Sequence, residues 1–509
     1  SLSMGALAGS YCATASCGFA KNLRHDLFAQ VQNFSFENID KFSTSSLVTR
    51  LTTDVANVQM AYMMIIRMAI RAPLMLIFAF TMAFLMGGKM AYIFVVVVPL
   101  LGGGLYWMIK KAMPLFRKVF VKYDNLNNSI QENIKGMRVV KSFVREDYEK
   151  KKFDAAASNI CADFTQAERI MSLNGPLMQS CMFTVMLFVL YFGSYLIISS
   201  MGVKADVGQL SSMLTYSFQI LTSLMMVAMV LVMLVMAEES AERIAEVLTE
   251  QSSIREPEHP VREVADGSID FSHVYFKYSK SAKRNVLEDI NLHIASGETI
   301  GIIGGTGTSK SSLIQLISRL YDVSEGSVQV GGHDVREYDL TTLRNQVAVV
   351  LQKNVLFSGT ILENMRWGNA QASLLEIQEA CRLAQADEFI ERFPDGYDTH
   401  IEQGGSNVSG GQKQRLCIAR ALLKKPKILI LDDSTSAVDT RTDTLIRRAF
   451  AEEIPDTTKF IIAQRISSVQ DADRILVLDG GRVAAFGTHD ELLASSEIYR
   501  DVYDARRTC

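Results

Sequence analysis

Four long apolar runs constrain this chain more than any other feature of its sequence. They lie at about 58–86, 91–109, 172–199 and 209–236, all in the first half of the 509 residues. Runs of about 20 apolar residues have the length that an α-helix needs to cross a bilayer. Because backbone polar groups in lipid must be satisfied within their own segment, these runs predict membrane-spanning helices.

The segments between the runs differ in charge, and this difference predicts their orientation. Segments 21–57 and 110–170 carry clusters of basic residues, whereas 87–90 and 200–208 carry one lysine each. By the positive-inside rule, the two long segments are cytoplasmic. The same alternation makes residues 1–20 part of a truncated span that enters the cytoplasm, and we expect one further span to precede it.

Composition also divides the chain into two environments. Of 24 methionines, all but Met365 lie in the first 236 residues, which indicates an adaptable apolar region there. The formal net charge of −3 does not indicate a nucleic-acid partner. The 7 scattered cysteines form no C-x-x-C pair and are typical of small buried residues in a reducing compartment.

Two groups of polar residues lie inside the apolar runs. Arg67 and Arg71, one helical turn apart, either face a cavity or extend toward the membrane surface. The last run has a polar helical face, which either lines a water-filled cavity or forms hydrogen bonds between packed helices. Its members are Ser212, Thr215, Tyr216, Gln219, Thr222 and Ser223, and a methionine stripe that would suit varied apolar cargo continues from Met225.

A phosphate-binding motif opens the second half of the chain. Residues 304–311 read GGTGTSKS, after a strand-like run at 299–303 and before a helical pattern at 312–321. They match G-x-x-x-x-G-K-[ST] except that Ser309 stands where the motif has glycine. In such a loop the lysine neutralises the outer phosphates and the last hydroxyl reaches Mg²⁺. The sequence therefore predicts a nucleotide site.

A second motif, SGGQ at 409–412, opens a helical pattern whose first N–H groups can also bind phosphate oxygens. After it, the apolar run 428–431 predicts a buried strand that stops at Asp432 and Asp433. A P-loop enzyme holds its magnesium ion at a carboxylate in this position. The three features in this order argue strongly against a chance match.

On these motifs the chain resembles an ATP-binding cassette (ABC) exporter half, similar to one subunit of the bacterial heterodimeric multidrug exporters. The resemblance covers essentially the whole sequence. It implies an all-α transmembrane domain of the six-span type over 1–250, a linker at 251–266, and a cytoplasmic α/β P-loop nucleotide-binding domain over 267–509. It also implies a dimer of two halves in a plasma membrane, with short coupling helices near 38–42 and 150–159.

The resemblance assigns expected roles to particular residues. Tyr278 would stack on adenine, although a tyrosine of the core is the alternative. Gln352 would touch metal and water, and Asp439 would lie in a loop that crosses the dimer interface. In the family, ATP lies between the phosphate loop of one half and the SGGQ of the other. The expected ATP contacts are Tyr278, Gly304, Gly305, Thr306, Gly307, Thr308, Ser309, Lys310, Ser311, Ser312, Ser409, Gly410, Gly411, Gln412 and Asp439, and the expected Mg²⁺ ligands are Ser311, Gln352 and Asp432.

Two residues depart from the family pattern at the hydrolytic step. Asp433 stands where the family has the glutamate that orients water, and a displacement of about 1 Å can lower a rate about a hundredfold. Gln464 stands where the family has a histidine against the γ-phosphate, and an amide cannot take up charge. Because both changes affect one event while SGGQ is intact, we expect a heterodimer in which this chain's own site hydrolyses poorly.

The expected function is therefore ATP-driven export of lipophilic, multidrug-type substrates with a second half-transporter. Two alternatives stay open: a homodimeric lipid flippase, and a membrane subunit that senses ATP without transport. An adaptable apolar lining is compatible with dyes, drugs, lipids or peptides, so the sequence leaves the cargo undetermined.

Overall fold

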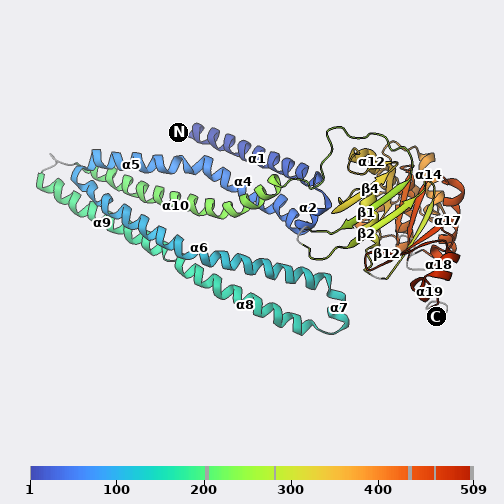
Figure 1. Cartoon of the computed structure of the whole chain (residues 1–509). Helices are drawn as coiled ribbons and strands as arrows, with labels where there is room; N and C mark the ends of the chain where they lie inside the picture. Colours follow the sequence, from blue (N-terminus) through green and yellow to red (C-terminus); the bar gives the residue numbers. More distant parts are fainter. Residues whose placement is uncertain are drawn as a thin grey trace. The chain divides into compact units, whose positions relative to one another are not determined.

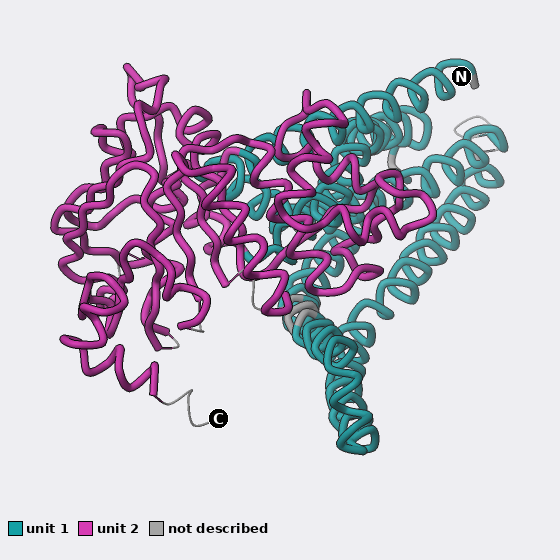
Figure 2. The backbone as a smooth tube through the Cα atoms, turned by 90° about the vertical axis from the view of Figure 1, so that its right-hand side faces the viewer, with its two compact units in different colours: residues 1–32, 43–250 teal, residues 33–42, 251–509 magenta. Residues whose placement is uncertain are grey.

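The structure is a computed structural model of the chain, and it describes residues 2–200, 206–279, 282–305, 307–433, 438–463 and 466–504. It divides into two compact units, of which the first comprises residues 1–32 and 43–250 and the second comprises 33–42 and 251–509 (Figures 1 and 2). The first unit ends at residue 250. Residues 33–42, which the sequence analysis placed in the transmembrane domain, group with the second unit.

The described part of the first unit is entirely helical. Its elements are α1 (Leu2–Gln32), α3 (Thr44–Thr49), η1 (Arg50–Asp54), α4 (Val55–Met64), η2 (Ile65–Ala69), α5 (Arg71–Gly87), η3 (Gly88–Ala91), α6 (Tyr92–Lys135), α7 (Met137–Ser142), α8 (Glu146–Met171), α9 (Asn174–Ser200) and α10 (Val207–Thr249). Both η1 and η2 are π-helical turns. Arg67 lies on η2 and Arg71 starts α5, and both side chains are exposed in this unit.

Four helical segments of the described residues are long and apolar enough to cross a membrane. They are Thr44–Gly87, Tyr92–Phe116, Glu146–Ser199 and Val207–Thr249, and they contain the four apolar runs of the sequence. The expected truncated span at about 1–20 lies in α1, which packs against α4 and α10 and is not one of these four.

Small residues allow close packing of the helices in the first unit. Ala79 and Ala83, one turn apart on α5, are fully buried, and α5 makes extensive contact with α10. A Cβ atom added at Gly87 would lie 2.2 Å from the Sδ atom of Met213 on α10. Close approach of backbones through small residues is the main way in which helices associate in lipid.

The short helix expected at 150–159 is not a separate element of the structure. Residues 150–159 are inside the continuous helix α8, so this prediction was wrong. A short helix, α7, lies between Gly136, where α6 ends, and Val144, whose φ of 51° turns the chain. Helix α8 starts at Glu146 with acidic residues in its first turn, which favours a helix start there.

The second unit is an α/β domain with a central six-stranded sheet in the order β12-β11-β3-β10-β9-β6. A four-stranded sheet, β2-β1-β4-β5, and the pair β7-β8 complete its strands. The strands are β1 (Ile269–Phe276), β2 (Leu287–Ile294), β3 (Thr299–Ile303), β4 (Glu325–Val330), β5 (His333–Asp334), β6 (Val347–Val350), β7 (Gly359–Thr360), β8 (His400–Ile401), β9 (Ile428–Asp432), β10 (Thr458–Ile462), β11 (Arg474–Asp479) and β12 (Arg482–Gly487).

Helices surround these sheets (Figure 1). They are α2 (Phe36–Lys41), α11 (Lys310–Ile317), α12 (Leu340–Gln346), α13 (Ile361–Arg366), α14 (Leu374–Leu383), α15 (Asp387–Ile390), η4 (Gly396–Asp398), η5 (Gln403–Gly405), α16 (Gly410–Leu422), α17 (Thr440–Glu453), η6 (Ile466–Ser468), α18 (His489–Ser495) and α19 (Glu497–Asp504).

The six-stranded sheet separates two hydrophobic cores. In β9, Ile428 and Ile430 belong to the core shared with α11 and the four-stranded sheet, whereas Leu429 and Leu431 face the core of α14, α16 and α17. Side chains alternate between the faces of a strand, so a strand buried on both faces is apolar throughout. This explains the continuous apolar run that ends at Asp432.

Candidate functional site

The parallel strands bring the predicted site residues to one edge of the six-stranded sheet. In register, Val350 pairs with Leu431, and Ile462 pairs with both Asp432 and Ile302. The carboxyl ends of β6, β9, β10 and β3 therefore lie side by side. We call the described residues at or after these ends, 304–305, 307–312, 352 and 432–433, the phosphate edge. Two predicted site residues, Thr306 and Gln464, lie outside the described residues.

Lys310 is held by the loop that it follows. Its Nζ atom donates hydrogen bonds to the carbonyl oxygens of Gly304 and Gly305, each at 2.8 Å, and Thr308 Oγ1 is 3.4 Å away. Burial lowers the pKa of Lys310, and the charges of Asp432 and Asp433 oppose this shift. The loop thus concentrates one cation at the start of α11, where a helix N-terminus also favours anions.

The backbone of the loop uses two left-handed residues. Gly307 has φ of 83°, and Ser309 has φ of 68° and ψ of 21°. The left-handed conformation costs about 1–2 kcal/mol for an L-residue with a side chain, whereas glycine adopts it freely. Ser309, the departure noted in the motif, therefore occupies a position that favours glycine.

Ser311 and Asp432 form the best-defined pair of oxygen ligands at the phosphate edge. The Ser311 hydroxyl donates to Asp432 Oδ2 at 2.8 Å, although the two residues are 121 positions apart in the sequence. Burial raises the pKa of Asp432, which the Ser311 hydrogen bond opposes. A buried carboxylate beside a hydroxyl offers the hard oxygen donors that Mg²⁺ prefers. Gln352, the third expected ligand, is exposed after β6.

Asp433 follows Asp432 in an unusual backbone conformation. Its φ is 47°, and its N–H donates to the carbonyl oxygen of Ile462 at 3.0 Å. The hydrogen bond ties Asp433 to the end of β10, directly before the segment that carries Gln464. The two positions that depart from the family pattern therefore follow neighbouring strands.

Tyr278 lies against the first turn of α11. Its hydroxyl is 2.8 Å from Ser312 Oγ and donates to Gln315 Oε1 at 3.3 Å. Its ring packs edge-on against Tyr321, with centroids 5.1 Å apart, and it keeps 40% of its surface exposed. Tyr278 is therefore a partly exposed aromatic residue beside the phosphate loop.

The SGGQ segment, Ser409–Gln412, is preorganised by a capping box. Ser409 Oγ accepts from the Gln412 N–H at 3.3 Å, and Gln412 Oε1 accepts from the Ser409 N–H at 2.9 Å. This arrangement fixes the start of α16. Ser409 and Gly410 are exposed, so they are available to a second molecule. Asp439 is likewise exposed and caps α17 by accepting from the Thr442 N–H at 3.0 Å.

Tyr321 contacts the expected site residue Tyr278, although no sequence motif singled it out. Tyr321 lies four residues after the end of α11, is 9% exposed, and contacts both Tyr278 and Asp40. Its apolar helical pattern indicated only a core position. Asp40 is 281 residues away in the sequence, and no local pattern reports such a contact.

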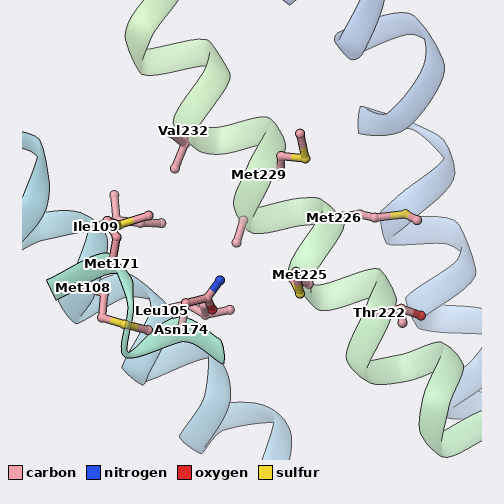
Figure 3. A pocket seen from close by; sticks show the side chains of 11 residues that line it. Leu105, Met108, Ile109, Met171, Asn174, Thr222, Met225, Met226, Met229 and Val232 are labelled. Carbon is pink, nitrogen blue, oxygen red and sulfur yellow. The ribbon is translucent and has the colours of Figure 1, made fainter. Parts of the chain in front are cut away.

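A cavity of about 390 Å³ lies in the first unit, and its lining is almost entirely apolar (Figure 3). Helices α6, α8, α9 and α10 contribute Leu105, Met108, Ile109, Met171, Asn174, Thr222, Met225, Met226, Ala228, Met229 and Val232. Methionine is unbranched and polarisable, so its side chain adapts to ligands of different shapes.

The polar face of α10 makes contacts within its own helix, with a neighbouring helix and with a cavity. The hydroxyls of Ser212, Thr215 and Thr222 donate to the carbonyl oxygens four residues earlier, at 2.9, 3.1 and 2.8 Å. Gln219 Nε2 contacts the Sδ atom of Met75 on α5 at 3.4 Å. Three of the six polar side chains are therefore satisfied within α10 itself, Gln219 contacts a neighbouring helix, and Thr222 also lines the cavity.

Comparison with known families agrees with the two units. A family model described as the ABC transporter transmembrane region matches residues 2–224, and a model described as ABC transporter matches residues 287–436.

Curated relatives match nearly the whole chain. The ABC transporter ATP-binding protein YfiB of Bacillus subtilis (strain 168) is 37% identical over 506 residues, which cover 99% of this chain and 87% of that protein. Rv1273c of Mycobacterium tuberculosis (strain ATCC 25618 / H37Rv), an ABC transporter ATP-binding protein, is 35% identical over 489 residues, 95% of this chain and 83% of that protein.

A solved structure of a bacterial Atm1-family ABC exporter with ATP bound is similar with a TM-score of 0.86 and 26% sequence identity. The similarity covers 98% of this chain and 87% of that one. The predicted fold class, a helical transmembrane domain joined to an α/β nucleotide-binding domain, is confirmed. The chain belongs to the ABC transporter family, as a multi-pass exporter half-transporter with a cytoplasmic ATPase domain.

Proposed function

We propose that this chain exports lipophilic, multidrug-type compounds as one half of a heterodimer, and that its own ATP site hydrolyses ATP poorly. The observation that carries this proposal is Asp433. It holds the position of the water-orienting glutamate with a side chain one methylene shorter, on a left-handed backbone tied to β10. A carboxylate displaced by about 1 Å from the water loses about a hundredfold in rate.

The phosphate edge would bind ATP even so. Lys310 would exchange its bonds to the carbonyls of Gly304 and Gly305 for bonds to phosphate oxygens, and Tyr278 would stack on the base. The Ser311–Asp432 pair fits Mg²⁺, with Gln352 as a further ligand from β6. When bound, Mg²⁺ would neutralise charge on the outer phosphates.

The exposed SGGQ segment supports the second half of the proposal. Ser409–Gln412 is intact and preorganised, so it could complete an ATP site on a partner's phosphate loop. The partner would then carry glutamate and histidine at the positions of Asp433 and Gln464. ATP binding would close the two nucleotide-binding domains, and short helices such as α2 and α7 would transmit this closure to the membrane helices.

The methionine-lined cavity supports lipophilic cargo. Its walls offer flexible thioethers and few polar groups, and its volume of about 390 Å³ is within the range of small-molecule pockets. Cargo of this kind would bind by apolar burial rather than by a fixed set of hydrogen bonds.

ATPase activity of the purified chain tests the proposal. We expect the chain alone to hydrolyse ATP at about 1% of the rate that it reaches with its partner. Fast turnover by the isolated chain would overturn the heterodimer and favour the homodimeric lipid flippase. Vesicle uptake by the pair then separates export from ATP sensing, because a sensor would move no cargo although it binds ATP.

A further inference from the structure

We propose that Tyr321 is a positioning residue that couples the adenine-binding tyrosine to helix α2, so that ATP binding and the docking of α2 on the second unit strengthen each other. The inference rests on the proposed role of Tyr278 in base stacking. It goes beyond that role because it names the contacts through which binding of the adenine base would affect helix α2. All the residues concerned belong to the second unit.

The first link is an aromatic cluster. Tyr321 packs edge-on against Tyr278, with ring centroids 5.1 Å apart at 85°, and it contacts Phe276 at 5.7 Å. Phe276 in turn contacts Tyr278 at 4.9 Å. Edge-to-face aromatic pairs are directional and contribute about 0.5–1.5 kcal/mol beyond their area. The Tyr321 ring therefore helps to set the orientation in which Tyr278 meets a base.

The second link joins Tyr321 to α2. The Tyr321 hydroxyl donates to Asp40 Oδ2 at 2.7 Å, and the Tyr321 ring lies 6.1 Å from that of Phe36. Burial and the neighbouring Asp40 raise the pKa of Tyr321, so its hydroxyl keeps the proton that it donates. A hydrogen bond to an ionised acceptor is stronger than one between neutral groups.

The segment that carries Tyr321 is held in place by the buried side chain of Arg319. Arg319 beside it is 3% exposed, and its Nε donates to Asp322 Oδ1 at 2.9 Å. The Arg319 Nη2 atom donates to the carbonyl oxygen of Arg255 at 3.0 Å. Helix α11 connects the two regions: the phosphate loop precedes its first residue, and the segment that carries Tyr321 follows its last one.

Helix α2 is anchored at its other end by the start of the linker. Asn38 Nδ2 donates to the carbonyl oxygen of Gln251 at 3.1 Å, the Ser253 N–H donates to Asn38 Oδ1 at 3.1 Å, and the hydroxyls of Ser35 and Ser253 are 2.7 Å apart. Residues 33–42 are also flanked on both sides by chain of the membrane unit. A change in how α2 is held would therefore act on a segment that is covalently continuous, on both sides, with the first unit.

A double-mutant cycle on ATP affinity tests this coupling in the full chain with its partner. The variants are Asp40→Asn and Tyr321→Phe, which keep side-chain size, and the readout is competition by ATP against photolabelling of this chain by 8-azido-ATP. We expect each variant to weaken ATP binding by about threefold to tenfold, and the double variant to be no weaker than either one. Glu37→Gln, on the same helix, is the matched control and should leave affinity unchanged.

If α2 docking strengthens ATP binding, ATP binding must strengthen α2 docking by the same factor. This reciprocal effect gives a second readout, which a purely structural role of Tyr321 would not change. ATP should slow hydrogen exchange of residues 36–41 in the parent chain, and Tyr321→Phe should abolish this protection without lowering the Tm. Additive effects in the cycle, or unchanged affinity in Asp40→Asn, would overturn the coupling. If Tyr278→Ala leaves ATP affinity unchanged, the base-stacking role itself fails; if only Tyr278→Ala weakens binding, the coupling alone fails.

Discussion

The phosphate edge and the SGGQ segment of this chain would take part in two different ATP sites of the proposed dimer, and they depart from the family pattern to different degrees. The phosphate edge carries Ser309 and Asp433 on left-handed backbone, and two expected hydrolytic groups are replaced. The SGGQ segment keeps its motif and a complete capping box. Under the proposed function, this difference means that the chain would turn over ATP poorly at its own site and still supply a competent surface to a partner.

Removal of the Ser409 hydroxyl is the strongest way to break this comparison. Ser409→Ala should lower ATP turnover of the pair about a hundredfold, because removal of one preorganised hydrogen-bond donor to a reacting group typically lowers the rate by about this factor. Steady-state ATPase activity of the purified pair measures the effect.

The matched control for this variant is Ser373→Ala. Ser373 caps α14 through the same box, with Glu376 Oε2 3.0 Å from the Ser373 N–H, but it lies outside the proposed ATP site. It should lower stability by a similar amount and leave turnover intact. Equal losses in both variants would mean that Ser409 matters only as a cap.

Restoring the family residues would remove the difference between the two segments. Asp433→Glu together with Gln464→His should raise single-site turnover of the isolated chain by about tenfold or more, since the carboxylate regains its reach. Rapid-quench measurement of ATP cleavage would show it. Asp433→Asn in the same background serves as the control and should keep turnover low.

Ser309→Gly sharpens the comparison at the level of the backbone. With φ of 68° at this position, glycine should relieve about 1 kcal/mol of strain and raise ATP affinity of the isolated chain about twofold. Gln385→Gly, which replaces another left-handed residue with φ of 56° away from the loop, should stabilise the chain without changing affinity. Calorimetric titration with ATP distinguishes the two variants.

The smallest expected effect concerns Asp439. Hydrogen bonds from the N–H and hydroxyl of Thr442 lower the pKa of Asp439. A lowered pKa contributes stability above the ordinary value and loses it as the pH falls through the lowered one. Asp439→Ala should lower the Tm by about 2–4 °C at pH 7, whereas Asp439→Asn should keep the cap and lose its pH dependence below about pH 4. An unchanged acid profile in Asp439→Asn would contradict this account.

Much of the fold could be predicted because it follows from local patterns. The four apolar runs gave four spans, and the apolar run before Asp432 indicated a buried parallel strand. Parallel strands share one carboxyl edge, so the proximity of Ser311 and Asp432 followed from their places after β3 and in β9. Among the described cysteines, Cys12, Cys181, Cys381 and Cys417 are buried as expected, whereas Cys17 and Cys161 are exposed.

The remainder depended on contacts or turns that a local pattern does not report. Residues 150–159 have a helical sequence pattern whether they form a short separate helix or part of a long one. Only Gly136 and Val144 mark the turns before and after α7. The assignment of 33–42 to the second unit rests on bonds such as Asp40 to Tyr321, which join distant parts of the chain. Hydroxyls on α10 donate to carbonyl oxygens of their own helix. Polarity alone does not distinguish such hydroxyls from those that line a water-filled cavity.

The cavity of Figure 3 has a chemical consequence beyond its fit to varied cargo. Peroxide oxidises thioether sulfur to sulfoxide, and this reaction converts a flexible apolar side chain of the lining into a polar, chiral one. Met108, Met171, Met225, Met226 and Met229 would undergo it together wherever oxidant reaches the cavity. A half-transporter with this lining would bind lipophilic compounds more weakly during oxidative stress. Its affinity would recover only after enzymatic reduction of the sulfoxides.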